Sequence, residues 1–448
     1  MIDDILPASM VDKYRQALDL IKESKYLKII THYDGDGTSS AIILTSMAKR
    51  MGKKFHLTYV KDLSQNGIRP LLSDDLVIFA DAGSDQLRFF PDAENIIVLD
   101  HHFYQKSNYK ALNINARDFG YDGTRGACGS TMAYIMALIA NEENADLFPF
   151  FMSGLIADKQ DLGGISGLNQ VIIDAYGFKY KKERTINLEA QSMLDSITYS
   201  TDPFFEGLTG YPDKVKTFLA DIEISPDATL NEINEEQKKK LANALSTLLL
   251  KQRVGLEALA YIENDIYYFD ELGYNSKQLS SIVDGNGKMG QNSVPVAYFL
   301  GYQSFKDEME KNWKMFKTKL IDYVYRAKSE LFPGKNVSYF YAPESEMAGA
   351  ISGILMLYLA DQTRPVIGFS VGKEDTKVSS RGTRKQVNRG LNLSIVMREA
   401  SQAVGGTGGG HDIAAGAVIP KGREMQFLEI ADKIVGTQLG QKNETVLN

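Results

Sequence analysis

Short apolar runs alternate with longer amphipathic segments through the first third of the chain. Five runs have the length and composition of β-strands: YLKIIT (26–31), KFHLTYV (54–60), DLVIFA (75–80), NIIVLD (95–100) and ALNIN (111–115). Three segments carry apolar residues at helical spacing: 39–52, 129–143 and 148–158. Strands separated by helices predict an α/β fold with a parallel sheet covered on both faces.

The pattern changes after about residue 200, where helical periodicity dominates. Segments 234–253 and 309–334 read as amphipathic helices, and the second ends at Pro333-Gly334. We therefore predict a mostly helical middle module at residues 201–335, preceded by an N-terminal domain at 1–200.

The rest of the chain, residues 336–448, is predicted to form a smaller α/β domain. NVSYFYAP and PVIGFSVGK read as strands, and GAISGILMLYLADQ reads as a helix between them. The glycine run GGTGGGHDIAAGAVI follows.

The composition argues against membrane-spanning, secreted and disulfide-bonded classes of protein. Hydrophobic residues make up 44% of the chain and charged residues 24%, which is ordinary for a globular protein. Apolar stretches fall short of the ~20 residues that span a membrane, and the first residues do not resemble a signal peptide. A single cysteine excludes an internal disulfide and favours a reducing compartment, so we expect a cytoplasmic protein without a membrane partner.

The segment THYDGDGTSS places His32, Asp34 and Asp36 directly after the first predicted strand. Like charges this close repel unless a positive group lies among them. The residues alone leave three interpretations open: a bound metal, a solvated turn or a helix cap.

Three further acidic clusters lie downstream. Asp81 ends one predicted strand, Asp100-His101-His102 ends the next, and Asp158 closes a helical pattern. Ligands bind at the carboxyl ends of parallel strands, so the clusters that follow strands should converge on one sheet edge. Asp158 joins them only if the fold returns it to that edge.

Carboxylates mixed with imidazoles suit a divalent ion, and bridging aspartates favour two ions, as in phosphoryl displacement. Gly35 and Gly37 are expected to let ions and a phosphate approach the backbone, next to the N-terminus of a helix. We see no comparable Ser, Thr or Cys constellation, so the expected attacking group is water activated by the ions.

A local excess of positive charge lies near the C-terminus. Between Lys373 and Arg398 there are seven basic residues and two acidic ones, although the whole chain has a net charge of −7. The run fits either a solvated face or a groove that contacts phosphates. Elsewhere, Cys128 is expected to be a small buried residue at a helix start, and His56 a strand residue without a chemical role.

Four segments resemble, in order, the four motifs of the DHH phosphoesterase superfamily: HYDGDG, DAG, LDHHF and GLIAD. Two later segments resemble the signature of its associated C-terminal domain: SSRGT and, after it, GGGHDIAAGA. Within the superfamily the chain is most similar to archaeal RecJ-like single-strand exonucleases. The resemblance implies six metal ligands: His32, Asp34, Asp36, Asp81, His101 and Asp158. The family's usual ion is manganese, sometimes magnesium. Bacterial RecJ has an aspartate where His32 stands, which leaves direct ligation by His32 open.

The resemblance also implies roles outside the ligand set. Asp100 would orient the histidines, and His102 would face the scissile phosphate. In the C-terminal domain, Arg381 would bind phosphate, while the turn formed by Gly409, Gly410 and His411 would contact the substrate.

The implied function is a two-metal exonuclease acting on single-stranded DNA or RNA. Two alternatives remain: a phosphodiesterase of short oligoribonucleotides or signalling dinucleotides, and a replisome scaffold with little catalysis, like an inactive eukaryotic relative. By resemblance, the GINS replication complex is a further expected partner, with the middle module as its expected contact. The lysine-containing signature of the superfamily's inorganic pyrophosphatases is absent from the sequence.

Overall fold

The computed structural model describes residues 2–61, 72, 74–90, 92–189 and 192–440. Internal contacts divide the chain into two compact units. Unit 1 comprises Met1–Arg184 and Asp265–Phe316, and unit 2 comprises Thr185–Asn264 and Lys317–Asn448. Among the described residues, no helix combines the length and apolar character that crossing a membrane would require.

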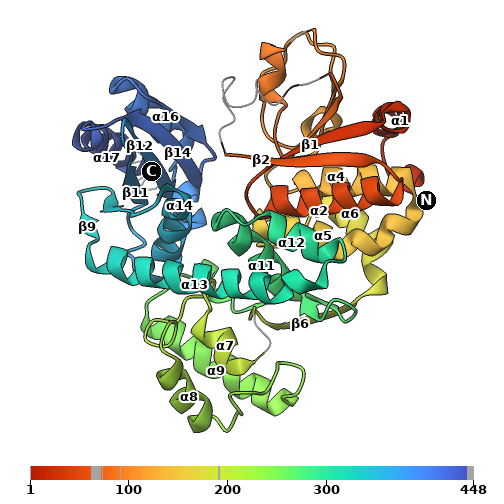
Figure 1. Cartoon of the computed structure of the whole chain (residues 1–448). Coiled ribbons are helices and arrows are strands. Elements are labelled where there is room, and N and C mark those ends of the chain that lie inside the picture. Colours follow the sequence, from red (N-terminus) through yellow and green to blue (C-terminus); the bar gives the residue numbers. More distant parts are fainter. Residues whose placement is uncertain (1, 62–71, 73, 91, 190–191, 441–448) are drawn as a thin grey trace, which may run out of the picture. The chain divides into compact units, whose positions relative to one another are not determined.

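The core of unit 1 is a five-stranded parallel sheet with the order β2-β1-β3-β4-β5 (Figure 1). Its strands are β1 (Tyr26–His32), β2 (Lys54–Val60), β3 (Leu76–Ala80), β4 (Ile96–Asp100) and β5 (Leu112–Asn115). Every residue of β3 and β4 is buried, as the continuous apolar runs predict for strands covered on both faces. The predicted parallel α/β sheet is confirmed.

Helices pack on one face of this sheet. They are α1 (Ala8–Glu23), α2 (Gly35–Arg50) and α4 (Gly129–Ala140). The other face has no comparable helical layer in the described residues: Phe79 and Val98 pack there against Leu87, which lies in the short 3-10 helix Asp85–Phe89.

Two more helices of unit 1 are α5 (Phe148–Ala157) and α6 (Gly167–Tyr176). Helix α5 packs against both α2 and α4. The C-terminal end of α5 therefore belongs to the same helical layer that supports the sheet.

Residues 265–316 also pack in unit 1, although the sequence pattern predicted one module at 201–335. This segment contains α11 (Ser276–Lys288) and α12 (Ser293–Phe299), and α11 packs against α2 and α5. Helix α13 (Lys306–Ser329) begins in unit 1 and continues into unit 2. The contacts thus divide the predicted middle module between the two units.

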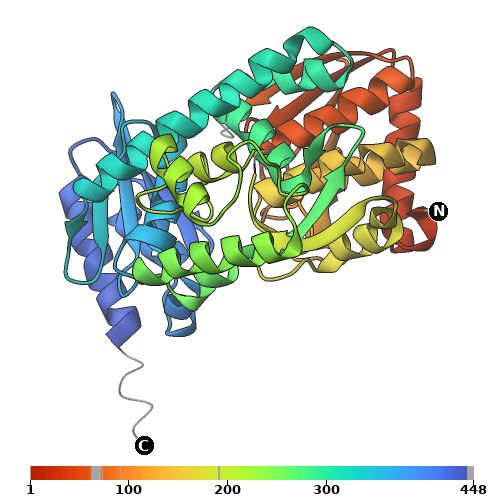
Figure 2. The ribbon, with the colours of Figure 1, turned by 90° about the horizontal axis from the view of Figure 1, so that it is seen from below.

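The middle region is helix-rich, as predicted, but it also contributes to a small sheet with the order β6-β7-β8 (Figure 2). The strands are β6 (Lys181–Ile186), β7 (Glu263–Phe269) and β8 (Tyr274–Asn275). The prediction missed these strands because β6 begins with four charged residues and its partner β7 lies far away in sequence.

The remaining helices of the middle region lie in unit 2: α8 (Pro212–Asp221), α9 (Glu235–Lys251) and α10 (Leu256–Ala260). Helix α7 (Met193–Thr198), which precedes this region, also lies in unit 2. A buried ion pair joins two distant segments of this unit, since Lys317 Nζ lies 2.6 Å from Glu189 Oε2 and donates to Thr201 Oγ1 at 2.7 Å.

The C-terminal part of unit 2 is a six-stranded mixed sheet with the order β13-β14-β12-β11-β10-β9. Its strands are β9 (Phe332–Pro333), β10 (Ser338–Tyr341), β11 (Val366–Val371), β12 (Asp375–Arg381), β13 (Thr407–Gly410) and β14 (Ala414–Pro420). Helix α14 (Ser345–Ile354) packs on β11 and β12, while α16 (Leu393–Ala403) and α17 (Glu424–Gly440) share an apolar core with the sheet. The short helix α15 (Arg384–Asn388) lies between β12 and α16. The predicted smaller α/β domain is confirmed.

Candidate metal centre

The register of the parallel sheet brings three of the predicted clusters to the same level. Thr31 of β1 pairs with Ala80 of β3, and Ala80 pairs with Leu99 of β4. The next residues along these strands are His32, Asp81 and Asp100, so all three lie at the carboxyl edge of the sheet.

Asp34 and Asp36 occupy the beginning of α2. Asp34 is the N-cap of this helix and accepts the backbone N–H of Gly37 at 3.1 Å. Its other carboxylate oxygen lies 2.8 Å from Nδ1 of His32. Asp36 is buried in the first turn and accepts backbone N–H groups from the start of α4, that of Gly129 at 2.6 Å and that of Ser130 at 2.8 Å. The helix-cap and metal interpretations of the sequence are therefore compatible, because Asp34 caps the helix while facing His32.

The fold does return Asp158 to this edge. It follows α5 as the C-cap residue and accepts a hydrogen bond from Nε2 of Gln160 at 2.8 Å. Asp158 offers a carboxylate oxygen within 4.8 Å of ligand atoms from Asp36 and His101. Packing of α5 against α2 and α4 provides this position, which no strand rule predicts.

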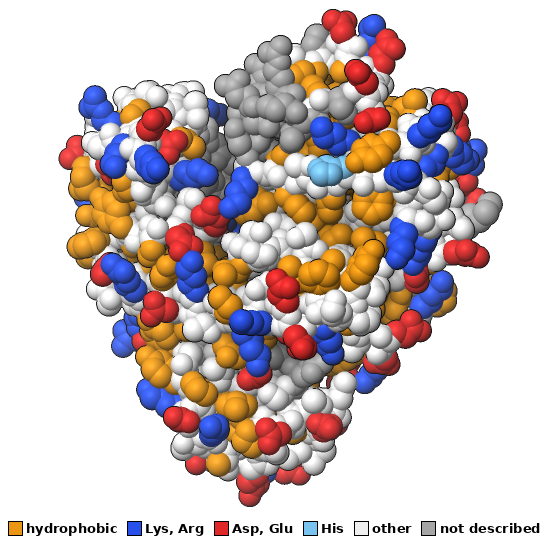
Figure 3. All heavy atoms as spheres, viewed as in Figure 1, with side chains coloured by type: hydrophobic (Ala, Val, Ile, Leu, Met, Phe, Trp, Pro, Cys, Tyr) orange, Lys and Arg blue, Asp and Glu red, His pale blue; other side chains and the backbone are white. Residues whose placement is uncertain are grey.

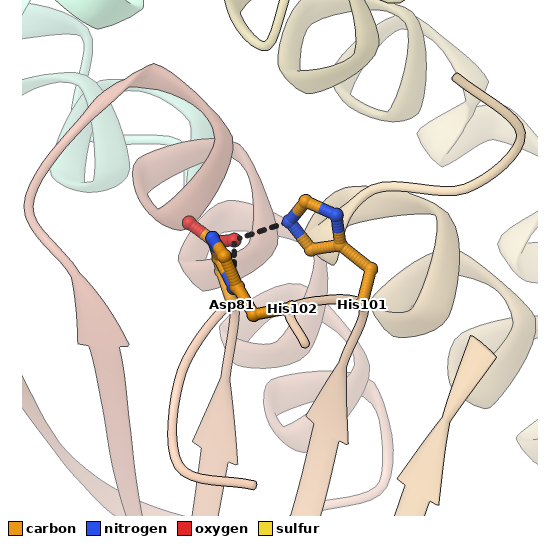
Figure 4. A group of neighbouring side chains, drawn as sticks. All are labelled: Asp81, His101 and His102. Carbon is orange, nitrogen blue, oxygen red and sulfur yellow. Dashed lines mark hydrogen bonds and ion pairs between the residues drawn. The ribbon is translucent and has the colours of Figure 1, made fainter. Parts of the chain in front are cut away.

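His101 points its Nε2 atom toward the carboxylate of Asp81 (Figure 4). Its Nδ1 lies 2.6 Å from the carbonyl oxygen of Gly123, which can only accept, so Nδ1 carries the hydrogen. In the neutral ring, the lone pair of Nε2 then faces Asp81 at 3.1 Å and Asp36 at 3.8 Å. A hydrogen bond from the opposite ring nitrogen is the usual way to orient a metal-binding histidine.

Asp100 orients His102 and the backbone of the DHH segment. It accepts the Nδ1–H of His102 at 2.8 Å and the backbone N–H groups of His101 at 2.8 Å and Ser84 at 3.0 Å. The sequence prediction was that Asp100 orients both histidine rings. In the structure Asp100 orients the ring of His102, whereas the carbonyl of Gly123 orients the ring of His101.

The ligand atoms fall into three overlapping groups, each with its atoms within 4.8 Å of one another. The groups are His32, Asp34 and Asp81; Asp36, His101 and Asp158; and Asp81, His101 and His102. The first two contain all six predicted ligands, and the contact between Asp81 and His101 joins them. Direct ligation by each residue stays a prediction, but the donor sets match those of divalent cations.

The electrostatics of these groups favour a bound cation. Burial raises the pKa of Asp81 well above its usual range, and the charges of Asp36 and Asp34 raise it further. Burial also raises the pKa of Asp158 to about 6, with Asp36 adding to the shift and His101 opposing it. Burial favours neutral His101, but Asp158 and Asp36 outweigh it and raise the pKa of the imidazole. A divalent ion among these oxygens would favour the ionised carboxylates and so offset both the burial and the mutual repulsion that raise their pKa values.

Glycines near the centre are required by close packing. A Cβ on Gly129 would lie 2.4 Å from Cβ of Asp81, and one on Gly154 would lie 2.4 Å from Oδ1 of Asp36. A Cβ on Gly37 would lie 2.1 Å from the carbonyl oxygen of His32, and one on Gly35 would lie 2.6 Å from Cβ of Ala157. The sequence prediction left these last two positions open for ions and phosphate, whereas the structure uses them for contacts within the chain.

Residues 32–36, which carry three of the predicted ligands, are called the metal loop below. Sequence reasoning missed the residues of α11 and of the start of α12 that hold this loop in place. Oδ1 of Asp284 accepts the N–H of Gly35 at 3.0 Å. The side-chain amide of Asn292, which is buried, donates to the carbonyl oxygen of Tyr33 at 2.5 Å and to Oγ1 of Thr38 at 2.8 Å. No local sequence signal could reveal these contacts, because they join residues about 250 positions apart.

The predicted substrate-binding residues lie together in unit 2. Arg381 ends β12, where it pairs with Ala414 of β14, and burial lowers the pKa of its guanidinium. Gly409 and Gly410 belong to β13 rather than to a turn, since Gly409 pairs with Gly416. Of the three residues predicted for that turn, only His411 lies in it, and its N–H donates to the carbonyl oxygen of Ala414 at 2.8 Å.

The expected positions of Cys128 at a helix start and of His56 in a strand are confirmed. Cys128 is buried at the N-cap of α4, where burial raises the pKa of its thiol well above the usual range. His56 is an exposed residue of β2.

Comparison with known proteins gives matches over both parts of the chain. The model of the DHH family N-terminal domain matches residues 27–157, and that of the DHHA1 domain matches residues 334–437. A curated relative, the uncharacterized protein MJ0831 of Methanocaldococcus jannaschii, is 33% identical over 450 residues, covering 96% of this chain and 98% of its own length. The chain belongs to the DHH family.

Solved structures give this DHH-family chain a RecJ-like fold. RecJ of Thermus thermophilus in complex with Mn²⁺ matches with a TM-score of 0.60 and 14% identity, covering 97% of this chain but only 55% of that chain. An exonuclease RecJ bound to manganese matches with a TM-score of 0.56 and 14% identity, covering 96% of each chain. CDC45 from Entamoeba histolytica matches with a TM-score of 0.59 and 12% identity, covering 96% and 99%. At these identities the matches establish the fold.

Proposed function

We propose that the protein is a divalent-metal-dependent exonuclease that hydrolyses phosphodiester bonds of single-stranded DNA or RNA. The observation that carries this proposal is the pair of three-residue donor groups in unit 1, joined by the 3.1 Å contact between Asp81 and His101. Two adjacent cation sites are the arrangement that two-metal hydrolysis of phosphodiesters requires. Manganese is the proposed ion and magnesium the alternative, in line with the Mn²⁺ of the similar RecJ structures.

In this proposal, the two donor groups would hold the ions, and bound ions would supply stabilisation of negative charge on the phosphate and activation of water. The protein's own contribution is to hold the donor atoms. Asp36 keeps its position through the N–H groups of Gly129 and Ser130, and His101 keeps its Nε2 turned inward through Gly123.

His102 is suited to contact the phosphate. Its side chain is 51% exposed and its ring donates to Asp100, so Nε2 is left to face a substrate. Partial desolvation by the surrounding protein and the charge of His101 lower the pKa of His102, but the charge and hydrogen bond of Asp100 outweigh them and raise it. A protonated imidazole there would donate a charge-assisted hydrogen bond to a phosphate oxygen.

In unit 2, we assign phosphate contact to Arg381 and the neighbouring glycine strand. Arg381 pairs with Ala414 of β14, and β13 is the next strand beyond β14. Glycine and alanine occupy the neighbouring positions of both strands, so a phosphate backbone can approach the sheet closely. Gly409, Gly410 and His411 complete the proposed surface.

The metal assignment is tested with Asp81→Ala and His101→Ala. Each is expected to abolish hydrolysis of an end-labelled single strand while largely sparing binding of the strand. Asp75→Ala is the matched control, because Asp75 is exposed just before β3, at the opposite end of the strand from Asp81. Persistent hydrolysis by both purified variants would refute the assignment.

The same assay separates the substrate classes. The exonuclease proposal predicts faster hydrolysis of a long single strand than of a dinucleotide at matched concentration. The reverse order would favour the alternative of a small-substrate phosphodiesterase.

Arg381→Ala tests the phosphate surface. Loss of one phosphate contact should weaken binding of single strands and reduce the slope of log affinity against log salt by about 0.7. Lys433→Ala on α17 serves as a control, since Lys433 is exposed on a helix that packs on the apolar core of the sheet. An unchanged slope for Arg381→Ala would show that Arg381 does not contact the phosphates of the bound strand.

A replisome role is the second proposal, and the CDC45-like fold favours it. We propose GINS as the partner and the exposed side of α9 and α10 as its contact, because Leu250 is 59% and Leu256 86% exposed there. The test is recovery of GINS by the double variant Leu250→Asp/Leu256→Asp compared with wild type. Point substitutions are preferable to deleting residues 205–330, since that deletion removes Asn292 and with it a contact to the metal loop. Equal recovery would exclude this contact.

A further inference from the structure

A cavity of about 460 Å³ lies in unit 1 beside the metal loop. One wall is formed by β2 and the residue after it, including His56, Tyr59 and Lys61. Another wall comes from the connection between α11 and α12, including Asn292 and Ser293. Tyr33 of the metal loop completes the lining. Nothing in the metal chemistry described above uses this cavity.

The ring of Tyr33 contacts the ammonium groups of two lysines. The ammonium of Lys61 lies 5.0 Å from the centre of the ring, and that of Lys288 lies 4.9 Å from it. Lys288 also lies 4.0 Å from Asp284 and is not among the residues that line the cavity, whereas Lys61 lines it. The cation–π contact holds Lys61 near the aromatic ring, and its ammonium keeps its charge for an anion.

The position of Tyr33 is itself fixed. Its carbonyl oxygen accepts the side-chain amide of Asn292, and its ring packs edge-on against the ring of His32 with centroids 4.8 Å apart. His32 in turn lies 2.8 Å from Asp34. The cavity is thus one residue away from the donor atoms of the candidate metal centre.

The lining matches the chemistry of a nucleotide. Aromatic rings of Tyr33, Tyr59 and the exposed His56 offer contacts to a base, and the hydroxyl groups of Thr58 and Ser293 can bond a sugar. An ammonium group is the usual partner of a phosphate. The volume also lies within the range of pockets that bind small ligands. Hydrophobic side chains lie beside Lys and Arg side chains on the face of unit 1 that carries β2 (Figure 3).

We propose that this cavity binds one nucleotide, with Lys61 contacting its phosphate. The inference rests on the proposed nuclease function and adds a binding site to it. Two sources supply the same chemistry: a released mononucleotide, or a nucleotide of the bound strand next to the one being cleaved.

The test measures binding of dAMP and of a long oligodeoxythymidylate to full-length protein by calorimetry, with EDTA present. Lys61→Gln is expected to weaken binding about tenfold, the loss of one charge-assisted contact. Lys54→Gln is the matched control, because Lys54 is an exposed lysine at the other end of β2 and does not line the cavity. Ser293→Trp provides a second variant that fills the cavity from an exposed position without removing charge, and it should abolish the same binding.

The outcomes distinguish the sources. If dAMP binds and Lys61→Gln weakens it, the occupant is a free mononucleotide. If only the oligonucleotide binds and Lys61→Gln weakens it, the occupant is part of the strand. Equal affinity of Lys61→Gln, Ser293→Trp and Lys54→Gln for both probes would overturn the inference. Hydrolysis is measured separately with metal, so a protein that binds nucleotide in the cavity without cleaving would refute the nuclease proposal alone.

Discussion

The carboxylate of Asp36 accepts the backbone N–H of Gly129 at 2.6 Å, which ties the first turn of α2 to the first turn of α4. Asp36 is buried, and its carboxylate lies at the N-terminus of α4, where free N–H groups and the helix dipole favour negative charge. The same glycine also touches Asp81, because a Cβ on Gly129 would lie 2.4 Å from Cβ of Asp81. One backbone position therefore sets the distance between two candidate metal ligands.

Gly129→Ala should disturb the metal centre without removing any donor atom. The added methyl group must displace Asp81 or α4, and we expect affinity for Mn²⁺ to fall about 10- to 100-fold, as for other losses of support around metal ligands. Calorimetric titration with Mn²⁺ checks this. Gly353→Ala on α14 is the control, since a Cβ there meets nothing within 4 Å. Wild-type affinity in Gly129→Ala would show that the contact has no influence on the ligands.

Asn292→Ala should lower the affinity of the metal centre for Mn²⁺, although Asn292 is not a candidate ligand. The substitution removes the amide that donates to the carbonyl of Tyr33 and to Thr38, which leaves a buried acceptor unpaired at a cost of about 1–3 kcal/mol. We expect affinity for Mn²⁺ to fall about tenfold if the loop moves in response to this loss. Gln291→Ala, at the exposed neighbouring position, should leave the affinity unchanged. Equal Mn²⁺ titrations for the two variants would contradict a positioning role.

The candidate ligands could be predicted from the sequence because each strand carries its own signal. Buried strands are short apolar runs, and the residues that follow them must share one edge of a parallel sheet. His32, Asp81 and Asp100 are found at that edge for this reason. The resemblance to DHH motifs added Asp158, whose position depends on how α5 packs against α2 and α4.

Contacts between distant segments could not be predicted in this way. Asp284 and Asn292 reach the metal loop only because α11 packs against α2 and α5. Helical periodicity predicts that a helix forms, but it does not predict which other helix it packs against. The strand β13 was also missed, since glycine has a low strand propensity and Gly409 is held in the sheet by pairing with Gly416. In both cases tertiary contacts decide what local sequence leaves open.

Lys317→Met should strongly destabilise unit 2. Both side chains of the pair between Lys317 and Glu189 are more than nine-tenths buried, so the substitution leaves a buried carboxylate without this partner, at a cost of about 3–5 kcal/mol. Urea denaturation measures the loss. The double variant Lys317→Met/Glu189→Leu should recover most of it, because two apolar groups replace both charges. A double variant less stable than Lys317→Met would contradict this account of the pair.

Asp158→Asn should stabilise the metal-free protein at neutral pH. The pKa of Asp158 is raised to about 6 in the folded state, from an ordinary value of 3.8, so the folded protein holds this proton more tightly than the unfolded chain. Stability is then lost as the pH rises between these two values, and ionisation of Asp158 costs about 3 kcal/mol above them. In EDTA, we expect the variant to have a higher Tm than wild type at about pH 8 and nearly the same Tm at about pH 4.

Addition of Mn²⁺ should give wild type a higher Tm than Asp158→Asn at about pH 8, the reverse of the order expected in EDTA. An ion at 100 times its Kd stabilises the folded wild type by about 2.7 kcal/mol, whereas a neutral amide at position 158 weakens the ion's site and forfeits much of this gain. Asp74→Asn, an exposed carboxylate before β3, should follow wild type under every condition. A lower Tm for Asp158→Asn in EDTA at about pH 8 would mean that the carboxylate of Asp158 stabilises the metal-free fold, and the cost inferred here for ionising this buried group would then be wrong.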